Sequence, residues 1–357
     1  MTQGKLYDQI LGSLALAGMG DALGASTEQW TMEEIATIHG PLVTAFTEPP
    51  EDTFAGANHG ARGEVTDDAS QMYHLAQALI RANGRLDQAS WIACLLDWAD
   101  TSPKAGFMGP STAGIVQALR DGTDPALVGI IGNSRRKMTN FGITNGAAMR
   151  VAPAGLIHPG DLLAACEQAF VTCLPSHDTD AAVSSACAIA AGVARALVEP
   201  SLDAVIEACL EGGHIGVRLA RERARMLPGP RFLARLELAL AIARREKTDR
   251  DFLVALDAAV GASVLAAESV PAAIAILAYA EGDPLRTIAL AASIGNDTDS
   301  IATMAGALAG AIHGAAALPQ PLYGEFLAVN AAYYRLDEMA AGLTELARAN
   351  LAGPHLG

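Results

Sequence analysis

Residues 295–314 read GNDTDSIATMAGALAGAIHG, and this stretch decides the fold. Its apolar residues recur at the spacing of one helix face, at Ile301, Ala305, Leu308 and Ile312. Glycines recur every four residues and would form a smooth stripe, at Gly306, Gly310 and Gly314. We therefore predict a helix that a neighbouring helix can approach closely.

The predicted helix opens on Asp297-Thr298-Asp299-Ser300, and a similar group, Thr66-Asp67-Asp68, precedes another run with helical spacing. One reading of each group is a helix N-cap, because Thr and Asp accept hydrogen bonds from the free amides of a first turn. A cap needs only one such residue, however, and each of these two groups contains several. Because hard divalent cations prefer all-oxygen ligands, we predict that the groups are two halves of one metal site.

A third acidic group is His177-Asp178-Thr179-Asp180. The remaining histidines are scattered, which argues against a metal site of the histidine-rich type. We expect Asp178 and Asp180 to cap a helix and keep His177 as a candidate substrate contact.

Composition favours an all-α fold. The 357 residues are 51% hydrophobic but only 5% aromatic, and alanine is frequent throughout. Length alone suggests two domains, whereas the uniform composition and the lack of a linker favour one domain over 1–357. The five cysteines lie in apolar helical stretches without C-x-x-C spacing, which is typical of reduced core residues in a cytoplasmic protein.

Periodicity predicts a succession of helices with short connections. The chain starts with a helix at 5–18, a glycine-rich turn at 18–24 and a loop-like segment up to Glu64. The later helices are expected at about 67–82, 87–100, 112–121, 146–157, 160–173 and 179–197, from about 200 to 260, and at 269–281 and 284–293, with a further helix after Asp299 that ends in His313.

The net charge is -15, so the chain repels phosphate backbones, and we expect no nucleic acid partner. Arginines gather between Arg218 and Arg245, but glutamates and leucines interleave with them, which favours a solvated helix face. No apolar run reaches the length of a membrane span without interruption, so we expect no membrane partner. The oligomeric state stays open.

Taken together, five motifs resemble the ADP-ribosylglycohydrolase family. They are Gly20-Asp21-Ala22-Leu23-Gly24 with Glu28, Val65-Thr66-Asp67-Asp68, Asn145-Gly146-Ala147-Ala148-Met149-Arg150, Glu268-Ser269-Val270-Pro271, and Asp297-Thr298-Asp299-Ser300. They occur in the family's order from about residue 5 to residue 315. The resemblance implies a compact, orthogonal multi-helix fold.

The resemblance also implies a centre of two Mg²⁺ or Mn²⁺ ions. Its ligands would be Thr66, Asp67, Asp68, Asp297, Asp299 and Ser300. Catalytic carboxylates would be Glu28, beside the metals, and Asp68. The substrate pocket would be lined by Gly109, Ser111, Thr112, Asn145, Gly146 and His177. Two departures from the family pattern are Asn296, where a glycine is common, and Ser300, where threonine is common.

Three functions follow as hypotheses. The first is a metal-dependent hydrolase that cleaves the C1″ ribosyl bond of an ADP-ribosylated protein or small molecule and releases ADP-ribose. The carboxylates agree with it, because cleavage builds positive charge on the sugar ring and a carboxylate can take a proton from water. The alternatives are an N-ribohydrolase of free nucleosides or small ribosides, and a catalytically silent protein that binds ADP-ribose or has a structural role.

Overall fold

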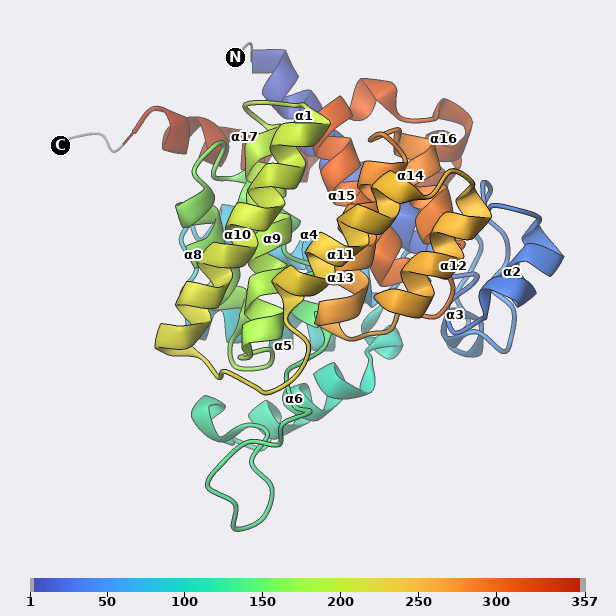
Figure 1. Cartoon of the computed structure of the whole chain (residues 1–357). Helices are drawn as coiled ribbons and strands as arrows, with labels where there is room; N and C mark the ends of the chain where they lie inside the picture. Colours follow the sequence, from blue (N-terminus) through green and yellow to red (C-terminus); the bar gives the residue numbers. More distant parts are fainter. Residues whose placement is uncertain (1–2, 354–357) are drawn as a thin grey trace.

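Helices α1 (Gln3–Gly24) and α15 (Thr298–His313) pack side by side in the computed structural model, which describes residues 3–353 (Figure 1). Glycines on both helices bring the two backbones into contact. A Cβ at Gly310 would lie 2.1 Å from the carbonyl oxygen of Gly12, and one at Gly306 would lie 2.5 Å from that of Leu16. The glycine stripe thus receives a neighbouring helix, as predicted.

The predicted glycine-rich turn at 18–24 is wrong, because α1 continues through it to Gly24. Here the glycines serve close packing rather than chain reversal. A Cβ at Gly20 would lie 2.3 Å from the carbonyl oxygen of Ala302, and one at Gly24 would lie 2.5 Å from the Cα of Asp299. The end of α1 is thereby pressed against the start of α15.

All other regular elements in residues 3–353 are also helical, which confirms the all-α class. The first half contains α2 (Met32–His39), α3 (Phe54–Ala57), α4 (Asp67–Arg81), α5 (Gln88–Thr101), α6 (Pro110–Arg120), α7 (Ala152–Leu156) and α8 (Leu162–Cys173). The second half contains α9 (Asp180–Ala196), α10 (Leu202–Arg223), α11 (Phe232–Arg245), α12 (Asp249–Ala259), α13 (Ala266–Tyr279), α14 (Pro284–Ala291), α16 (Gln320–Asn330) and α17 (Leu336–Leu351).

The segment expected as a loop up to Glu64 contains two helices, α2 and α3. Helix α2 has a capping box, in which the Thr31 hydroxyl accepts from the amide of Glu34 and the Glu34 carboxylate accepts from the amide of Thr31. The Thr-x-x-Glu spacing is a signal for this start that the sequence analysis did not use.

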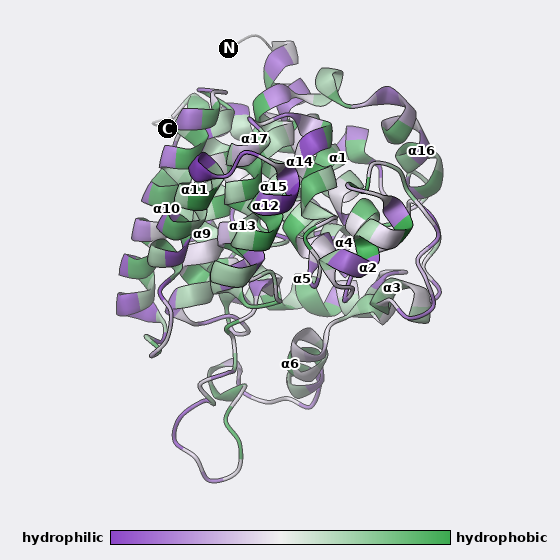
Figure 2. Ribbon diagram, turned by 45° about the vertical axis from the view of Figure 1, so that its right-hand side comes forward, coloured by the Kyte–Doolittle hydropathy of each residue, from purple (hydrophilic) through white to green (hydrophobic). Residues whose placement is uncertain are grey.

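One continuous apolar core contains residues from Leu6 to Ala347. Helices α9, α13 and α15 bury nearly all of their faces, and Figure 2 shows their apolar residues inside the helix assembly. Small alanine side chains permit such close packing. The five cysteines are buried and free, as expected of core residues. We therefore propose that the chain forms a single domain. Across residues 3–353, no helix has both the length and the apolar character needed to cross a bilayer.

Helix α6 and the segment 121–143 that follows it project from the helical body, at the bottom of Figure 1. Apart from one short 3₁₀ turn, Pro125–Leu127, this segment has no helical turn.

We expect Gly310→Ala to lower the melting temperature, because its methyl group would overlap the backbone of Gly12. Forced overpacking of a core costs about 1–3 kcal/mol. The matched control is Gly324→Ala in α16, where nothing lies within 4 Å of the new Cβ. Replacing that helical glycine should stabilise by roughly 0.5–1 kcal/mol. Equal melting temperatures for the two variants would contradict the backbone contact.

Candidate metal centre and active site

The first turns of α4 and α15 face one pocket of about 240 Å³. Thr66 caps α4, with its hydroxyl accepting from the amide of Asp68 at 3.3 Å. Asp297 stands at the N-cap position of α15. Because both helices begin at the pocket, the positive ends of their dipoles point toward its acidic side chains.

Asp21 on α1 fixes the start of α4. Its carboxylate is fully buried and accepts from the Thr66 amide at 3.0 Å, the Thr66 hydroxyl at 2.7 Å and the Ala69 amide at 2.9 Å. Asp21 was quoted in a motif but was not predicted to act at the site. Asp21 lies in the stretch predicted as a turn, and its partners Thr66 and Ala69 are distant in the sequence, so only the structure shows its role.

Backbone hydrogen bonds join the turn before α15 to residues 29–30, which follow Glu28. The Gln29 amide donates to the Asn296 carbonyl at 2.7 Å, and the Asn296 amide donates to the Trp30 carbonyl at 2.9 Å. Asn296 has a φ of 62°, in the left-handed region that asparagine tolerates better than most residues. This explains how asparagine can stand where the family commonly has glycine.

Three carboxylates meet at the floor of the pocket. Oxygens of Glu28, Asp297 and Asp299 lie within 4.8 Å of one another, and Asp67 and Asp68 line the same pocket. Two of the oxygens, Oε2 of Glu28 and Oδ2 of Asp68, are buried without a hydrogen-bond partner in residues 3–353. Such oxygens are free to ligate a cation.

Burial raises the pKa of each of these five carboxyl groups, and repulsion from neighbouring carboxylates raises it further for Glu28, Asp67, Asp68 and Asp297. The pKa rises to about 6 for Asp299 and about 8 for Asp297, and that of Glu28 to about 11. The pKa values of Asp67 and Asp68 lie well above the usual range. A divalent cation would offset this repulsion, and its preference for oxygen ligands matches the side chains present.

Asn145, which also lines the pocket, donates a hydrogen bond to Asp297. Its Nδ2 donates to Oδ2 of Asp297 at 2.5 Å and to Oγ of Ser269 at 2.9 Å. Its backbone amide donates to the Val264 carbonyl at 2.9 Å. These bonds fix the carboxylate and lower its cost of ionisation.

A buried cation supports Asp67. Nε2 of Gln71 donates to Oδ2 of Asp67 at 2.9 Å, and Arg150 donates to Oε1 of Gln71 at 2.6 Å. The Arg150 guanidinium also lies 4.7 Å from the ring centroid of Trp91. Burial lowers the pKa of Arg150 to about 10, so it stays charged at neutral pH. Arg150 belongs to one of the five motifs, but its contact with Gln71 was not predicted.

Eleven of the residues proposed from the sequence line the pocket: Glu28, Asp67, Asp68, Gly109, Ser111, Thr112, Asn145, Gly146, Asp297, Asp299 and Ser300. The other two lie behind its walls. Thr66 contacts Asp21, and His177 lies with its Nε2 3.0 Å from the hydroxyl of Thr144. Burial lowers the pKa of His177 to about 3, so it is neutral and supports the wall.

The helix-capping role expected for Asp178 and Asp180 belongs to Thr179, whose hydroxyl accepts from the Ala182 amide at 3.3 Å. Asp178 instead pairs with Lys137 and Arg225, and Asp180 pairs with Arg231. The nearby arginines therefore serve ion pairs as well as solvent contact.

Two aromatic side chains in the pocket, Phe54 and Phe107, were not anticipated. Phe54 begins α3, and Phe107 ends a short 3₁₀ turn after α5. They bring apolar surface to a pocket whose floor is acidic, so the pocket suits a ligand with one polar and one flatter, less polar part.

Comparison with known proteins shows to which family the chain belongs. A sequence model described as ADP-ribosylglycohydrolase matches residues 2–352. The chain belongs to the ADP-ribosylglycohydrolase family. It is 34% identical to the uncharacterised protein YegU of Escherichia coli (strain K12), over 90% of this chain and 93% of that protein.

Other members of the ADP-ribosylglycohydrolase family have names that state an activity. The chain is 28% identical to the ADP-ribosylhydrolase ARH3 of Bos taurus, over 87% of this chain and 86% of that one. It is 30% identical to the ADP-ribosyl-[dinitrogen reductase] glycohydrolase of Rhodospirillum rubrum, over 45% of this chain and 50% of that one. The chain is thus an enzyme of the glycosidase-type hydrolase class.

A solved structure of an ADP-ribosylglycohydrolase-related protein complex has the same fold. It aligns with a TM-score of 0.60 and 21% identity, over 97% of this chain and 99% of that chain. This agreement supports the orthogonal multi-helix arrangement expected from the sequence.

We expect Mg²⁺ or Mn²⁺ to raise the melting temperature of the wild type, since a cation at about 100 times its Kd stabilises by about 2.7 kcal/mol. Asp299→Asn should lose this shift. Without metal, the variant should melt above the metal-free wild type, because one source of repulsion at Asp297 and Glu28 is gone. Thermal unfolding with and without each cation checks both effects.

The control is Asp203→Asn, which changes an exposed acid in the first turn of α10. It should keep the metal-induced shift. A shift that survives Asp299→Asn would exclude Asp299 as a ligand.

Proposed function

We propose that the protein is a metal-dependent glycohydrolase that cleaves the C1″ ribosyl bond of an ADP-ribosylated substrate and releases ADP-ribose. The observation that carries the proposal is the convergence of Glu28, Asp297 and Asp299, with Asp67 and Asp68, in one pocket. The family to which the chain belongs and the names of its relatives support ADP-ribose as the substrate class.

The proposed ligands of two Mg²⁺ or Mn²⁺ ions are Thr66, Asp67, Asp68, Asp297, Asp299 and Ser300. When bound, the ions supply charge compensation and fix the hydroxyls of the terminal ribose. Of these residues, Thr66 has its hydroxyl engaged by Asp21. Because the hydroxyl donates its proton to Asp21, a lone pair on its oxygen would remain for an ion.

Glu28 is the proposed acid and base. It lies at the carboxylate cluster with Oε2 unpartnered, but without a cation its pKa of about 11 keeps it protonated at neutral pH. A bound cation would lower that pKa, and the ionised Glu28 could then take a proton from the attacking water as the water oxygen bonds to C1″. The bond from C1″ to the leaving group breaks with its electron pair, and the leaving group takes up a proton. Asp68, also with a free oxygen, is the second carboxylate near the positive charge that develops on the sugar.

The start of α6 is the proposed site for the diphosphate. Gly109, Ser111 and Thr112 line the pocket at the N-terminus of this 11-residue helix, which no side chain caps. Free amides and the helix dipole at such an end favour phosphate groups. Phe54 and Phe107 offer apolar surface for the adenine ring or the leaving group.

Pocket size keeps one alternative open. A volume of about 240 Å³ is below the usual range of about 300–1,000 Å³ for small-molecule pockets, and a free nucleoside or small riboside is smaller than ADP-ribose. Mass analysis of the products separates the two reactions. Release of ADP-ribose from a modified protein supports the proposal, and release of ribose from nucleosides alone supports the alternative.

We expect Glu28→Gln to reduce kcat on the ADP-ribosylated substrate by about 100-fold or more, because general acid and base catalysis contributes about 10²–10⁴. The variant should keep a metal-induced rise in melting temperature, since the aspartates remain. Glu51→Gln, at an exposed position, is the control and should behave as wild type. Wild-type kcat in Glu28→Gln would exclude Glu28 as the acid and base.

A further inference from the structure

The projecting segment 121–143 links two walls of the candidate active site. Its preceding helix, α6, starts at the pocket with Ser111 and Thr112, and its following residues, Thr144 and Asn145, line the pocket again. Any macromolecule with a side chain or attached group in the pocket would therefore lie beside this segment.

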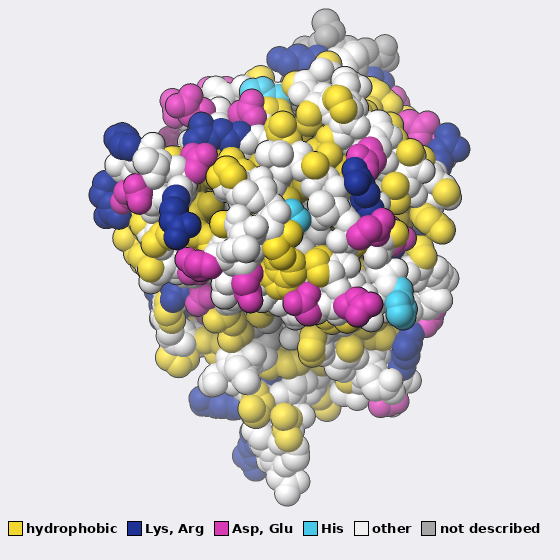
Figure 3. Space-filling view, turned by 90° about the vertical axis from the view of Figure 1, so that its right-hand side faces the viewer, with side chains coloured by type: hydrophobic (Ala, Val, Ile, Leu, Met, Phe, Trp, Pro, Cys, Tyr) yellow, Lys and Arg dark blue, Asp and Glu magenta, His cyan; other side chains and the backbone are white. Residues whose placement is uncertain are grey.

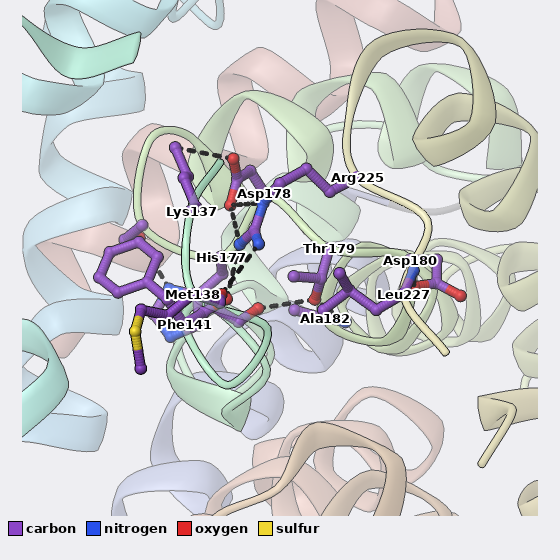
Figure 4. A network of polar contacts seen from close by, with 12 residues as sticks. Lys137, Met138, Phe141, His177, Asp178, Thr179, Asp180, Ala182, Arg225 and Leu227 are labelled. Carbon is purple, nitrogen blue, oxygen red and sulfur yellow. Dashed lines mark hydrogen bonds and ion pairs between the residues drawn. The ribbon is translucent and has the colours of Figure 1, made fainter. Parts of the chain in front are cut away.

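Ion pairs and hydrogen bonds hold the base of the segment (Figure 4). Asp178 pairs with Lys137 at 2.8 Å and with Arg225 at 2.7 Å. Arg225 also donates to the Phe141 carbonyl at 2.6 Å, and the Thr179 hydroxyl donates to the Gly142 carbonyl at 2.6 Å. The projection is thus attached firmly at the end that enters the active site.

A cavity of about 1080 Å³ lies between the segment and the connection that follows α10. It is lined by five cationic residues, Arg135, Arg136, Lys137, Arg223 and Arg225, and by two acidic ones, Asp124 and Asp178. Three of the five cations are already paired, Lys137 and Arg225 with Asp178 and Arg223 with Glu167, so the positive charge that remains is that of Arg135 and Arg136. Arg135 and Arg136 are exposed and make no ion pair with any residue from 3 to 353.

Apolar side chains lie among these cations. Ile131 is 67% exposed, Met138 is 47% exposed, and Met226 on the cavity wall is 41% exposed. In Figure 3, the lower projection shows Lys and Arg side chains next to hydrophobic ones. Exposed apolar groups beside unpaired arginines are typical of protein interfaces.

We propose that segment 121–143 and the cavity beneath it dock an acidic segment of the protein from which the active site removes ADP-ribose. The proposal rests on the proposed function and specifies its substrate as an acidic protein. Charge complementarity favours this partner, because no acid among the described residues forms an ion pair with Arg135 or Arg136.

Nucleic acid is the other polyanion to consider. The chain as a whole repels it, and the residues lining the cavity include no aromatic side chain on which a base could stack. The apolar side chains of Ile131 and Met138 would also add no binding energy to a phosphate backbone. An acidic peptide that carries some apolar residues fits the surface better.

The binding test uses a fluorescent Glu- and Asp-rich peptide of about twelve residues with two leucines, titrated with the full chain at low salt. The double variant R135E/R136E should bind it about tenfold more weakly. The control R85E/R244E makes the same change in net charge at two exposed arginines outside the cavity, and it should bind like wild type. Salt should weaken wild-type binding more than that of R135E/R136E.

No binding by the wild type, or equal loss in both double variants, would overturn the docking surface. A single-stranded oligonucleotide that displaces the peptide at lower concentration than unlabelled peptide would overturn it in favour of nucleic acid.

The turnover test compares kcat/KM for an acidic ADP-ribosylated protein with kcat/KM for a small ADP-riboside. The ratio should fall about tenfold in R135E/R136E, through KM, and should stay constant in R85E/R244E. An unchanged ratio in R135E/R136E would contradict docking. If the wild type cleaves neither substrate, the proposed function fails, while the peptide titration still decides the docking surface.

Discussion

The contact between the backbones of α1 and α15 is the constraint on which the rest of the structure depends. Glycines at matching positions remove the side chains that would separate the two helices. The contact sets Gly24 against Asp299, so Glu28, just beyond α1, comes next to the acids that open α15. One packing interface thus builds the centre of the core and positions the floor of the pocket.

A second requirement is balance of charge around the acids. The chain stabilises them with helix N-termini, with the amide of Asn145 and, behind Asp67, with the buried Arg150 acting through Gln71. These contacts leave the carboxyl pKa values raised, so the protein alone does not neutralise the cluster. Stability of the fold and affinity for a cation therefore oppose each other here, as is common at functional sites.

Local patterns in the sequence were enough to predict the helix that follows Asp297, its glycine stripe and the acidic groups at two helix starts. They did not predict that α1 continues to Gly24. Closely spaced glycines are typical of turns, and only the structure shows that these glycines pack against α15. The contacts of Asp21 and Arg150 were not predicted for a similar reason, because the residues that they bind are distant in the sequence. Phe54 and Phe107 carried no periodic signal, and the sequence did not show that His177 is buried with its Nε2 3.0 Å from the Thr144 hydroxyl.

The two groups of acids come from opposite parts of the chain, with Asp67 and Asp68 early and Asp297 and Asp299 late. During synthesis, Asp297 and Asp299 leave the ribosome long after Asp67 and Asp68. An incomplete or partly unfolded chain offers only half a site. In the proposed metal centre, a cation could therefore bind only after both ends of the polypeptide have come together, so metal binding would be coupled to the completion of folding.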